Sequence, residues 1–279
     1  MKKLALILIL LFSIDASYAG GGWSQPKGKG FLKLSQSAII AGSYFSPSGD
    51  ILDITTTSLY SSSVFLEYGL TDRLTGIVYM PFFVRSTLNR LETSDGDLVQ
   101  EGDELNSIGD TDVTIKYGLI QNSTYVLSAS LTLGLPLGEA SGGETQLLQS
   151  GDGEFNQMLT FELSRGFNSG LYATVLAGFN NRTNNFSDEF RYGGEIGYAK
   201  GKVIPILKVY GVASLMNGDD LGVPNNGVFS NNIEYLSFTP EVLYNINGKF
   251  GVTAAVGMAA FGKRLLAAPN FMGGIYWNL

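Results

Sequence analysis

The 279-residue chain contains no histidine and no cysteine. Without histidine there can be no Ser-His-Asp triad, no imidazole general base and no imidazole metal ligand. Without cysteine there can be no disulfide framework, no zinc–thiolate site and no thiol nucleophile. These two absences exclude much of hydrolytic, metal-dependent and thiol chemistry.

Charge is also scarce. The chain has 18 Lys and Arg against 25 Asp and Glu, a formal net charge of −7. Charged residues make up 15% of the chain, below the roughly 25% of an average soluble domain. An acidic chain lacks the basic surface that binds phosphate backbones, so no nucleic-acid partner is expected. Glycine, by contrast, is abundant, with 36 residues.

The amino-terminal residues have the pattern of a secretory signal. Met1-Lys2-Lys3 is basic, residues 4–12 form one apolar run, and Ser17-Tyr18-Ala19 supplies small residues at a cleavage site. The run is shorter than the roughly 20 residues that a membrane helix needs. We therefore predict a signal peptide over residues 1–19. Residues 20–30 are rich in glycine and lysine and unpatterned, which predicts a flexible segment.

From residue 31 onward, large apolar side chains occupy every second position. In 124–136 the apolar side chains fall on odd positions and are interleaved with Ser, Thr and Gly. Period-two alternation indicates β-strands with two unlike faces. The pattern predicts an all-β protein with twelve strands, at about 31–40, 59–70, 74–85, 111–119, 124–136, 155–166, 171–181, 190–199, 203–215, 234–246, 250–262 and 271–279.

The predicted connections alternate between short and long along the chain. The short ones carry turn residues, as in Asn247-Gly248, which tolerate the positive φ angles of tight hairpins. The long ones are predicted at 41–58, 86–110, 137–154, 182–189, 216–233 and 263–270. Within the strands, Pro240 cannot donate to a backbone ladder and predicts a bulge or local unpairing.

A soluble β-sandwich and a transmembrane β-barrel both produce alternating apolar and polar residues. The composition of the polar face discriminates between these two folds. A soluble sandwich exposes many Lys, Glu and Arg on its outer face. Here the polar face is mostly Ser, Thr, Gly and Asn, and the other face is rich in Leu, Val, Ile, Tyr and Phe. That is typical of a transmembrane antiparallel up-and-down β-barrel, apolar outside and polar inside. The prediction is a barrel over residues 31–279.

Charged side chains in mid-strand should avoid lipid, because Lys or Arg there costs about 2–4 kcal/mol. With one exception they fall on the polar parity, which predicts that they line the lumen. The exception is Arg165, which lies beside a turn, where its long side chain can reach the headgroups. Two interpretations stay open: the charges line a pathway for solute, or they pair across the lumen and make the barrel rigid. The predicted lumen-lining residues are Lys33, Glu67, Lys116, Glu162, Arg191, Glu195, Lys208 and Glu241.

An even number of strands puts both termini on the side of the short turns, which is the periplasm in bacterial barrels. The last residues, Gly274-Ile275-Tyr276-Trp277-Asn278-Leu279, resemble the carboxy-terminal signal that the outer-membrane assembly machinery recognises. We therefore expect the mature protein in the Gram-negative outer membrane, with lipid and that machinery as partners.

Two acidic groups are candidate sites of chemistry. Asp110 and Asp112 point to the same face of a strand, roughly 6.5–7 Å apart, a spacing that suits a carboxylate pair in glycoside hydrolysis. A polar strand end facing the lumen is the simpler interpretation. The second long loop is acidic, which favours a solvated loop over a calcium site; its carboxylates are Glu92, Asp95, Asp97, Glu101, Asp103 and Glu104.

Several runs resemble one family of outer-membrane barrels. They are EYGLTDRLT at 67–75, GDTDVTIKY at 109–117, LPLG at 135–138 and GDGEF at 151–155. The same motifs, in the same order, characterise the family called MetA-pathway of phenol degradation or SphA-like transporters. The resemblance covers the chain from about residue 58. It implies a barrel that admits aromatic or other hydrophobic small molecules.

These observations together predict a function. The expected protein is an outer-membrane channel or transporter for passive passage of small hydrophobic or aromatic molecules, without cofactor, metal or catalytic residues. The alternative is a non-transporting structural or surface-binding protein that uses its long acidic loops. An enzyme is not expected, because outer-membrane phospholipase, protease and palmitoyltransferase sites rely on histidine.

Overall fold

The computed structural model describes residues 21–93, 95–122, 124–219 and 228–279. The predicted signal peptide lies outside the described residues. Strands, turns and loops account for all the residues described. Within them, no helix is long and apolar enough to cross a membrane.

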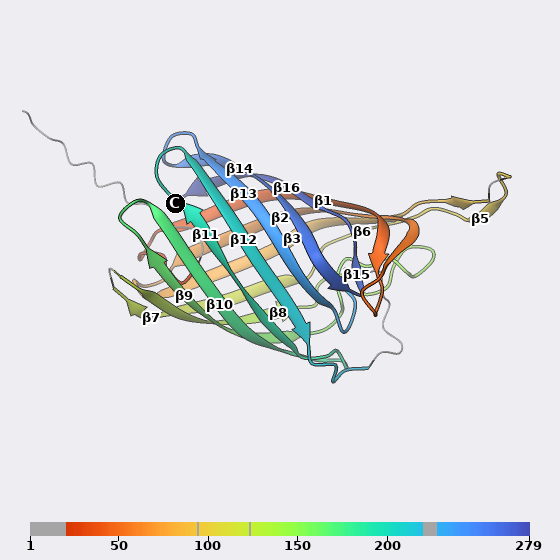
Figure 1. The fold of residues 1–279 in the computed structure, drawn as a ribbon, viewed down its shortest axis with the longest axis horizontal. Coiled ribbons are helices and arrows are strands. Elements are labelled where there is room, and N and C mark those ends of the chain that lie inside the picture. Colours follow the sequence, from red (N-terminus) through yellow and green to blue (C-terminus); the bar gives the residue numbers. More distant parts are fainter. Residues whose placement is uncertain (1–20, 94, 123, 220–227) are drawn as a thin grey trace, which may run out of the picture.

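Twelve long strands form one antiparallel sheet that closes into a barrel (Figure 1). The prediction of an all-β antiparallel barrel is therefore confirmed. The strands are β1 (Gly30–Phe45), β2 (Ile51–Gly69), β3 (Leu74–Leu88), β7 (Thr111–Gln121), β8 (Val126–Leu135), β9 (Asn156–Gly166), β10 (Leu171–Arg182), β11 (Glu189–Tyr198), β12 (Val203–Ser214), β13 (Glu234–Asn245), β14 (Phe250–Lys263) and β16 (Asn270–Asn278).

The first strand closes the sheet. One edge of β1 pairs with β2, from Gly30↔Tyr68 onward, and its other edge pairs with β16, from Phe31↔Asn278 to Ile39↔Asn270. Every other long strand pairs with its neighbours in chain order. Closure leaves no long strand with an unpaired edge, which is what a β-structure in lipid requires.

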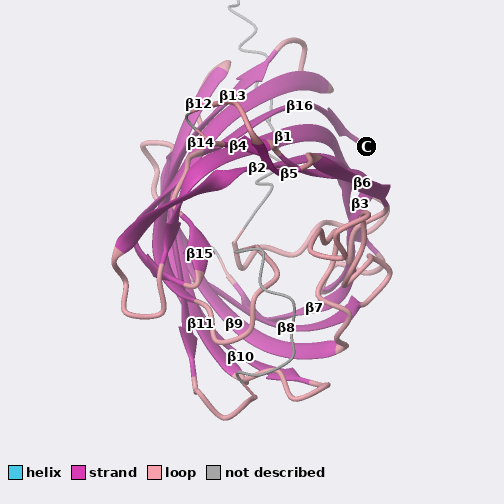
Figure 2. Ribbon diagram, turned by 90° about the vertical axis from the view of Figure 1, so that its right-hand side faces the viewer, coloured by secondary structure: helices cyan, strands magenta, loops and turns pink. Residues whose placement is uncertain are grey.

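The alternation of the sequence separates the two faces of the wall. Val113, Leu131 and Ile196 point outward and are exposed, so they are not packed between two layers. Their neighbours Thr114, Ser130 and Thr132 point inward and are buried; Thr114 and Thr132 hydrogen-bond across the strands at 2.7 Å between hydroxyl oxygens. Figure 2 shows the strands closing into a ring. The apolar face is therefore the outside of the barrel, and the hydroxyl-rich face encloses the lumen.

The two ends of the barrel differ in their connections. Five short turns join strands at one end, between residues 69–74, 121–126, 166–171, 198–203 and 245–250. Gly170, Gly201 and Gly248 adopt positive φ of 82–95° there, a conformation that glycine adopts without strain. Leu279 donates its N–H to the Gly30 carbonyl oxygen at 2.8 Å. Residue 279 therefore lies at the short-turn end.

The connections at the other end depart from expectation in several places. The predicted long loop over 41–58 is wrong: β1 and β2 continue to Phe45 and Ile51 and meet in a tight turn. Ser46 holds that turn, because its backbone N–H and side-chain hydroxyl both bond Asp50. The part of a strand that extends beyond the lipid-facing surface does not need alternating apolar side chains. The sequence pattern therefore did not predict these strand ends.

The expected loop over 86–110 contains short strands. These are β4 (Leu91–Glu92), β5 (Leu98–Gln100) and β6 (Asp103–Ser107). The β4–β5 hairpin projects beyond the barrel, and β6 returns to pair with the end of β3 (Figure 1). One further short strand, β15 (Leu265–Leu266), pairs with the end of β1.

Proline positions coincide with irregular pairing. The register of β13 with β14 passes from Phe238↔Met258 to Glu241↔Ala255 and omits Pro240, which is the local unpairing predicted. Pro81 adjoins the β-bulge where the register of β2 with β3 shifts. Pro81 and Pro240 therefore lie at irregular pairing, as expected of a residue that cannot donate to the ladder, whereas Pro205 keeps its register opposite Val242.

The outward position of Leu131 gives the first testable prediction. Leu131 lies in the middle of β8, and Leu137 lies in the loop after it. The two side chains are almost equally exposed, at 49% and 47%. Leu131→Arg should lower the unfolding free energy in lipid by about 2–4 kcal/mol, because it places a cation against acyl chains. Leu137→Arg is the matched control and should have little effect. Equal effects in urea titrations of the reconstituted variants would contradict a lipid-facing Leu131.

Candidate functional site

The lumen contains a cavity of about 550 Å³. Ten of the twelve long strands contribute to its wall, namely β1, β2, β3, β9, β10, β11, β12, β13, β14 and β16. Apolar side chains make up much of the lining, including Phe31, Phe65, Leu176, Ile206 and Met272. A space of this size is within the range of small-molecule sites.

The structure brings five of the eight predicted lumen-lining residues to this cavity: Lys33, Glu162, Glu195, Lys208 and Glu241. Lys116 and Glu67 lie beside it, in an ion-pair cluster that includes Glu162. Arg191 lies nearer the long-loop end and pairs with Glu189 at 2.7 Å between Nη2 and Oε2.

Glu241 is the centre of one cluster. Its Oε2 accepts the Lys208 ammonium at 2.6 Å, and its Oε1 lies 3.6 Å from the Lys33 Nζ. The Thr253 hydroxyl also donates to Oε1, at 2.8 Å. One carboxylate therefore serves two lysines from two other strands.

Lys116 is the centre of a second cluster. Its Nζ lies 3.3 Å from Glu162 Oε2 and 3.6 Å from Glu67 Oε1. All three side chains lie on the inward face, and those of Lys116 and Glu67 are buried. Ion pairs across several strands match the interpretation in which lumen charges brace the barrel.

Residues 21–28 lie against the inner wall beside the Lys116 cluster. Lys116 Nζ donates to the Gly21 carbonyl oxygen at 2.8 Å, and the Gly22 N–H donates to Ser164 Oγ at 2.8 Å. The indole of Trp23 meets the Tyr172 ring edge-on, 5.8 Å between centroids. The Gly28 N–H donates to the Gly69 carbonyl oxygen. The segment expected to be flexible thus makes defined contacts inside the short-turn end.

Close packing explains Gly21 and Gly22 of this segment. A Cβ added at Gly22 would lie 2.8 Å from the Glu162 carbonyl oxygen, and one at Gly21 would lie 2.4 Å from Thr174 Oγ1. Only a residue without a side chain fits so near the strands. Gly21 also lines the cavity, so this segment forms part of its floor.

A third cluster, at the long-loop end, was missed by the sequence analysis. Arg182 ends β10 and pairs with Asp152 at 2.9 Å, Glu154 at 2.6 Å and Glu189 at 2.8 Å. Its guanidinium also lies 4.4 Å from the centroid of the Phe186 ring. Arg182 shares the inward parity of Thr174 and Asn180, which was the signal available in the sequence. The cluster ties the loop between β8 and β9 to the barrel wall.

Asp110 fastens the same loop. Its carboxylate accepts the N–H of Gly138 at 2.9 Å and that of Asp152 at 2.7 Å. Burial, and then the nearby Asp152 carboxylate, raise the pKa of Asp110 to about 7. Asp110 precedes the first residue of β7, and it acts here as a loop acceptor.

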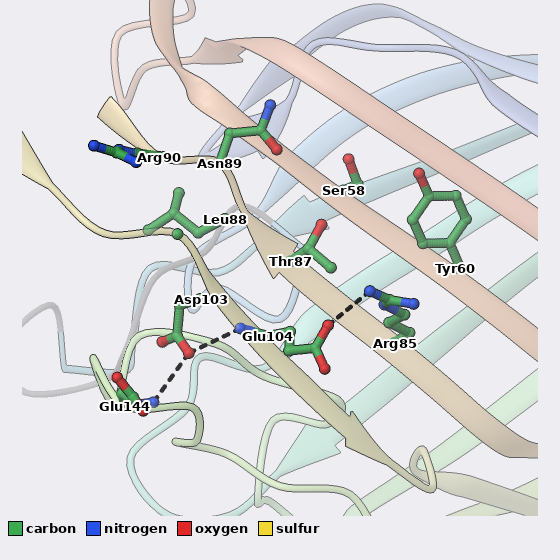
Figure 3. A pocket seen from close by; sticks show the side chains of 11 residues that line it. Ser58, Tyr60, Arg85, Thr87, Leu88, Asn89, Arg90, Asp103, Glu104 and Glu144 are labelled. Atoms are coloured by element: carbon green, nitrogen blue, oxygen red, sulfur yellow. Dashed lines mark hydrogen bonds and ion pairs between the residues drawn. The ribbon is translucent and has the colours of Figure 1, made fainter. Parts of the chain in front are cut away.

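The acidic loop residues form no metal site among the residues described. Asp103 instead accepts the backbone N–H groups of Glu144 and Thr145 at 3.0 and 2.9 Å. Near it, a polar cavity of about 870 Å³ surrounds the Arg85–Glu104 ion pair at the ends of β2, β3 and β6 (Figure 3). Tyr60 and Arg85 occupy the outward parity of the wall there. This cavity therefore lies outside the lumen.

Comparison with known proteins places the fold. No family model and no curated protein sequence matches the chain. Among solved structures, an outer membrane channel from Pseudomonas putida F1 is similar over 94% of this chain and 99% of its own, with TM-score 0.60 and 15% identity.

Two porins also share the fold. The NanC porin is similar over 89% of this chain and 100% of its own, with TM-score 0.54 and 8% identity. The KdgM porin, solved with oligogalacturonate, is similar over 88% and 99%, with TM-score 0.50 and 6% identity. These likenesses show the architecture of outer-membrane barrels.

The Lys116 cluster predicts a specific stability effect. Lys116→Met leaves Glu67 and Glu162 without their common cation and should cost about 3–5 kcal/mol of unfolding free energy, because breaking a buried ion pair strands the remaining charge. Adding Glu67→Gln should recover part of the loss. Urea unfolding of the two variants measures both effects. A Lys116→Met protein as stable as wild type would show that the cluster carries no net energy.

The raised pKa of Asp110 predicts pH-dependent docking of the loop over 136–155. Folding raises this pKa from 3.8 to about 7, so the folded state binds the proton more tightly and docking weakens as pH rises toward 7. Amide exchange at Gly138 and Asp152, corrected for intrinsic rates, should quicken as the pH rises from about 4 to about 7 and then level off, because above that range the carboxyl is ionised in both states. In Asp110→Asn that change should disappear. Equal pH dependence in both proteins would refute the assignment.

Proposed function

We propose that this protein is an outer-membrane channel for passive passage of small, hydrophobic or aromatic molecules. The observation that carries the proposal is the cavity inside the closed wall, lined by Phe31, Phe65, Leu176, Ile206 and Met272. An apolar solute gains from burial against such a lining, at about 25 cal/mol per Å². No step of this passage needs a cofactor or an energy source.

The location follows from the outer surface and the termini. The exposed apolar side chains of the strands suit acyl chains, and residues 1–19 have the pattern of a secretory signal. We infer that the short-turn end, which holds residues 21–30 and 279, faces the periplasm. The long-loop end then faces the outside, and the carboxy-terminal strand is the part read by the assembly machinery.

A non-transporting role is the alternative, and one observation favours it. Residues 21–28 lie against the inner wall at the short-turn end, and the Lys116 cluster occupies the lumen beside them. A lumen filled by these groups would make a structural barrel whose acidic loops bind a partner. Passage of solute decides between the two functions.

The test is transport by the purified chain in liposomes. Benzamide, a neutral aromatic solute, should enter liposomes that contain the protein faster than it enters empty ones. Osmotic shrinkage and recovery, followed by stopped-flow light scattering, measures the rate. Influx equal to that of empty liposomes would remove the channel function and leave the structural alternative.

The floor formed by residues 21–28 should limit the rate. Gly22→Val puts a side chain where the Glu162 carbonyl oxygen lies, so it should displace the segment and raise ion conductance in planar bilayers. Gly42→Val is the control, because a Cβ at Gly42 meets only the Thr56 hydroxyl oxygen, at 3.9 Å. Unchanged conductance in Gly22→Val would show that the segment does not restrict passage.

A further inference from the structure

The charged residues that line the cavity have a net negative charge, but its positive side chains are more exposed than two of its three glutamates. Two lysines and three glutamates line it. The side chains of Lys33 and Lys208 are 27% and 40% exposed, whereas that of Glu241 is 7% exposed. The side chain of Glu162 is 17% exposed. Both lysine side chains are therefore more exposed than those of Glu241 and Glu162, although carboxylates outnumber lysines on the lining.

The carboxylates of Glu241 and Glu162 are paired within the protein. Both oxygens of Glu241 accept donors within the protein, from Lys208 and from Thr253. Glu162 pairs with Lys116. The Oε1 atom of Glu195 is buried and has no hydrogen-bond partner within the described residues. The Glu241 carboxylate beside Lys33 therefore has both of its oxygens engaged within the protein.

The ammonium group of Lys33 has more N–H donors than its ion pair uses. An ammonium group carries three N–H donors, and the ion-pair partner of Lys33 in the described part of the chain is one oxygen of Glu241, 3.6 Å away. That oxygen already accepts the Thr253 hydroxyl at 2.8 Å. An incoming acceptor can therefore bind the Lys33 ammonium while the Glu241–Lys208 pair stays in place.

Aromatic side chains surround the Lys33 position. Phe65 on β2 and Tyr276 on β16 lie directly opposite Lys33 in the two neighbouring ladders. The Phe31 ring stacks on Tyr276, 5.3 Å between centroids, and meets Phe65 edge-on at 6.3 Å. One ammonium thus lies at the margin of an apolar, aromatic surface.

We propose that the cavity selects apolar molecules that carry a carboxylate, and that Lys33 is the residue that recognises the carboxylate. The proposal rests on the channel function above and names its solute class. The acceptor oxygens bind Lys33, the exposed Lys208 ammonium adds attraction, and the apolar body packs on Phe31 and Phe65. A charge-assisted hydrogen bond in such a partly desolvated site discriminates against a neutral analogue of the same shape.

The test compares three planar ligands of equal size: benzoate, benzamide and benzamidinium. Calorimetric titration of the folded protein in detergent at pH 7 should give a Kd for benzoate roughly tenfold below that for benzamide, with benzamidinium weakest. Lys33→Met should remove the preference for benzoate and leave benzamide binding unchanged. Lys33→Arg should retain the preference, because it keeps the charge.

The control is Lys200→Met, at the exposed turn between β11 and β12, which should bind all three ligands as wild type does. Migration of unboiled samples on a gel reports whether each variant is folded. If Lys33→Met does not fold, Glu241→Gln replaces it: that change frees both ammonium groups and should tighten benzoate binding.

Two results would overturn the carboxylate proposal while the channel stands: equal Kd values for benzoate and benzamide in wild type, or tightest binding of benzamidinium. The first would show a purely apolar site, and the second a site for cations. The absence of benzamide influx into liposomes would instead overturn the channel function, so the two failures are distinguishable.

Discussion

The structure depends on one constraint: a β-sheet in lipid must leave no backbone N–H or C=O unpaired. The pairing of β1 with both β2 and β16 satisfies it by closing the sheet. Closure also separates the two faces of every strand, and period-two alternation then puts Leu, Val and Phe outside and Ser, Thr and Gly inside. Charged side chains in the middle of the strands share the inner face, because lipid excludes them from the outer one; Arg85 and Arg165, which take the outward parity, lie near strand ends.

Enclosing charges in a lumen has its own cost, since each buried ion loses hydration. Three clusters offset that cost, around Lys116, Glu241 and Arg182. The first lies beside residues 21–28 at the short-turn end, and the third fastens a loop at the long-loop end. The second lies on the cavity and leaves the Lys33 ammonium only partly satisfied. The polar groups that brace the wall therefore also define what the space between them can bind.

The sequence predicted the strands well wherever alternation reaches the apolar band, as in β10, expected at 171–181 and found at Leu171–Arg182. The sequence did not predict the long-loop ends of β1 and β2. These ends extend beyond the part of the barrel that faces lipid, so their side chains need not alternate between apolar and polar. The sequence also could not show the contacts of the amino-terminal segment: Lys116 and Gly21 are 95 residues apart, and no local pattern encodes such a contact. The sequence predicted that the charged side chains point inward, but it did not predict which residues they form ion pairs with. Arg182 could have been found by extending the parity of β10 to its last residue.

The central claim is that outward and inward residues alternate along every strand, and spin labels test it most directly. The chain has no cysteine, so single cysteines can be placed along β8 without background. In lipid bilayers, labels at 127, 129, 131 and 133 should be accessible to oxygen, which concentrates among acyl chains. Labels at 128, 130 and 132 should be shielded from it. Oxygen accessibility without a period of two along β8 would contradict the account.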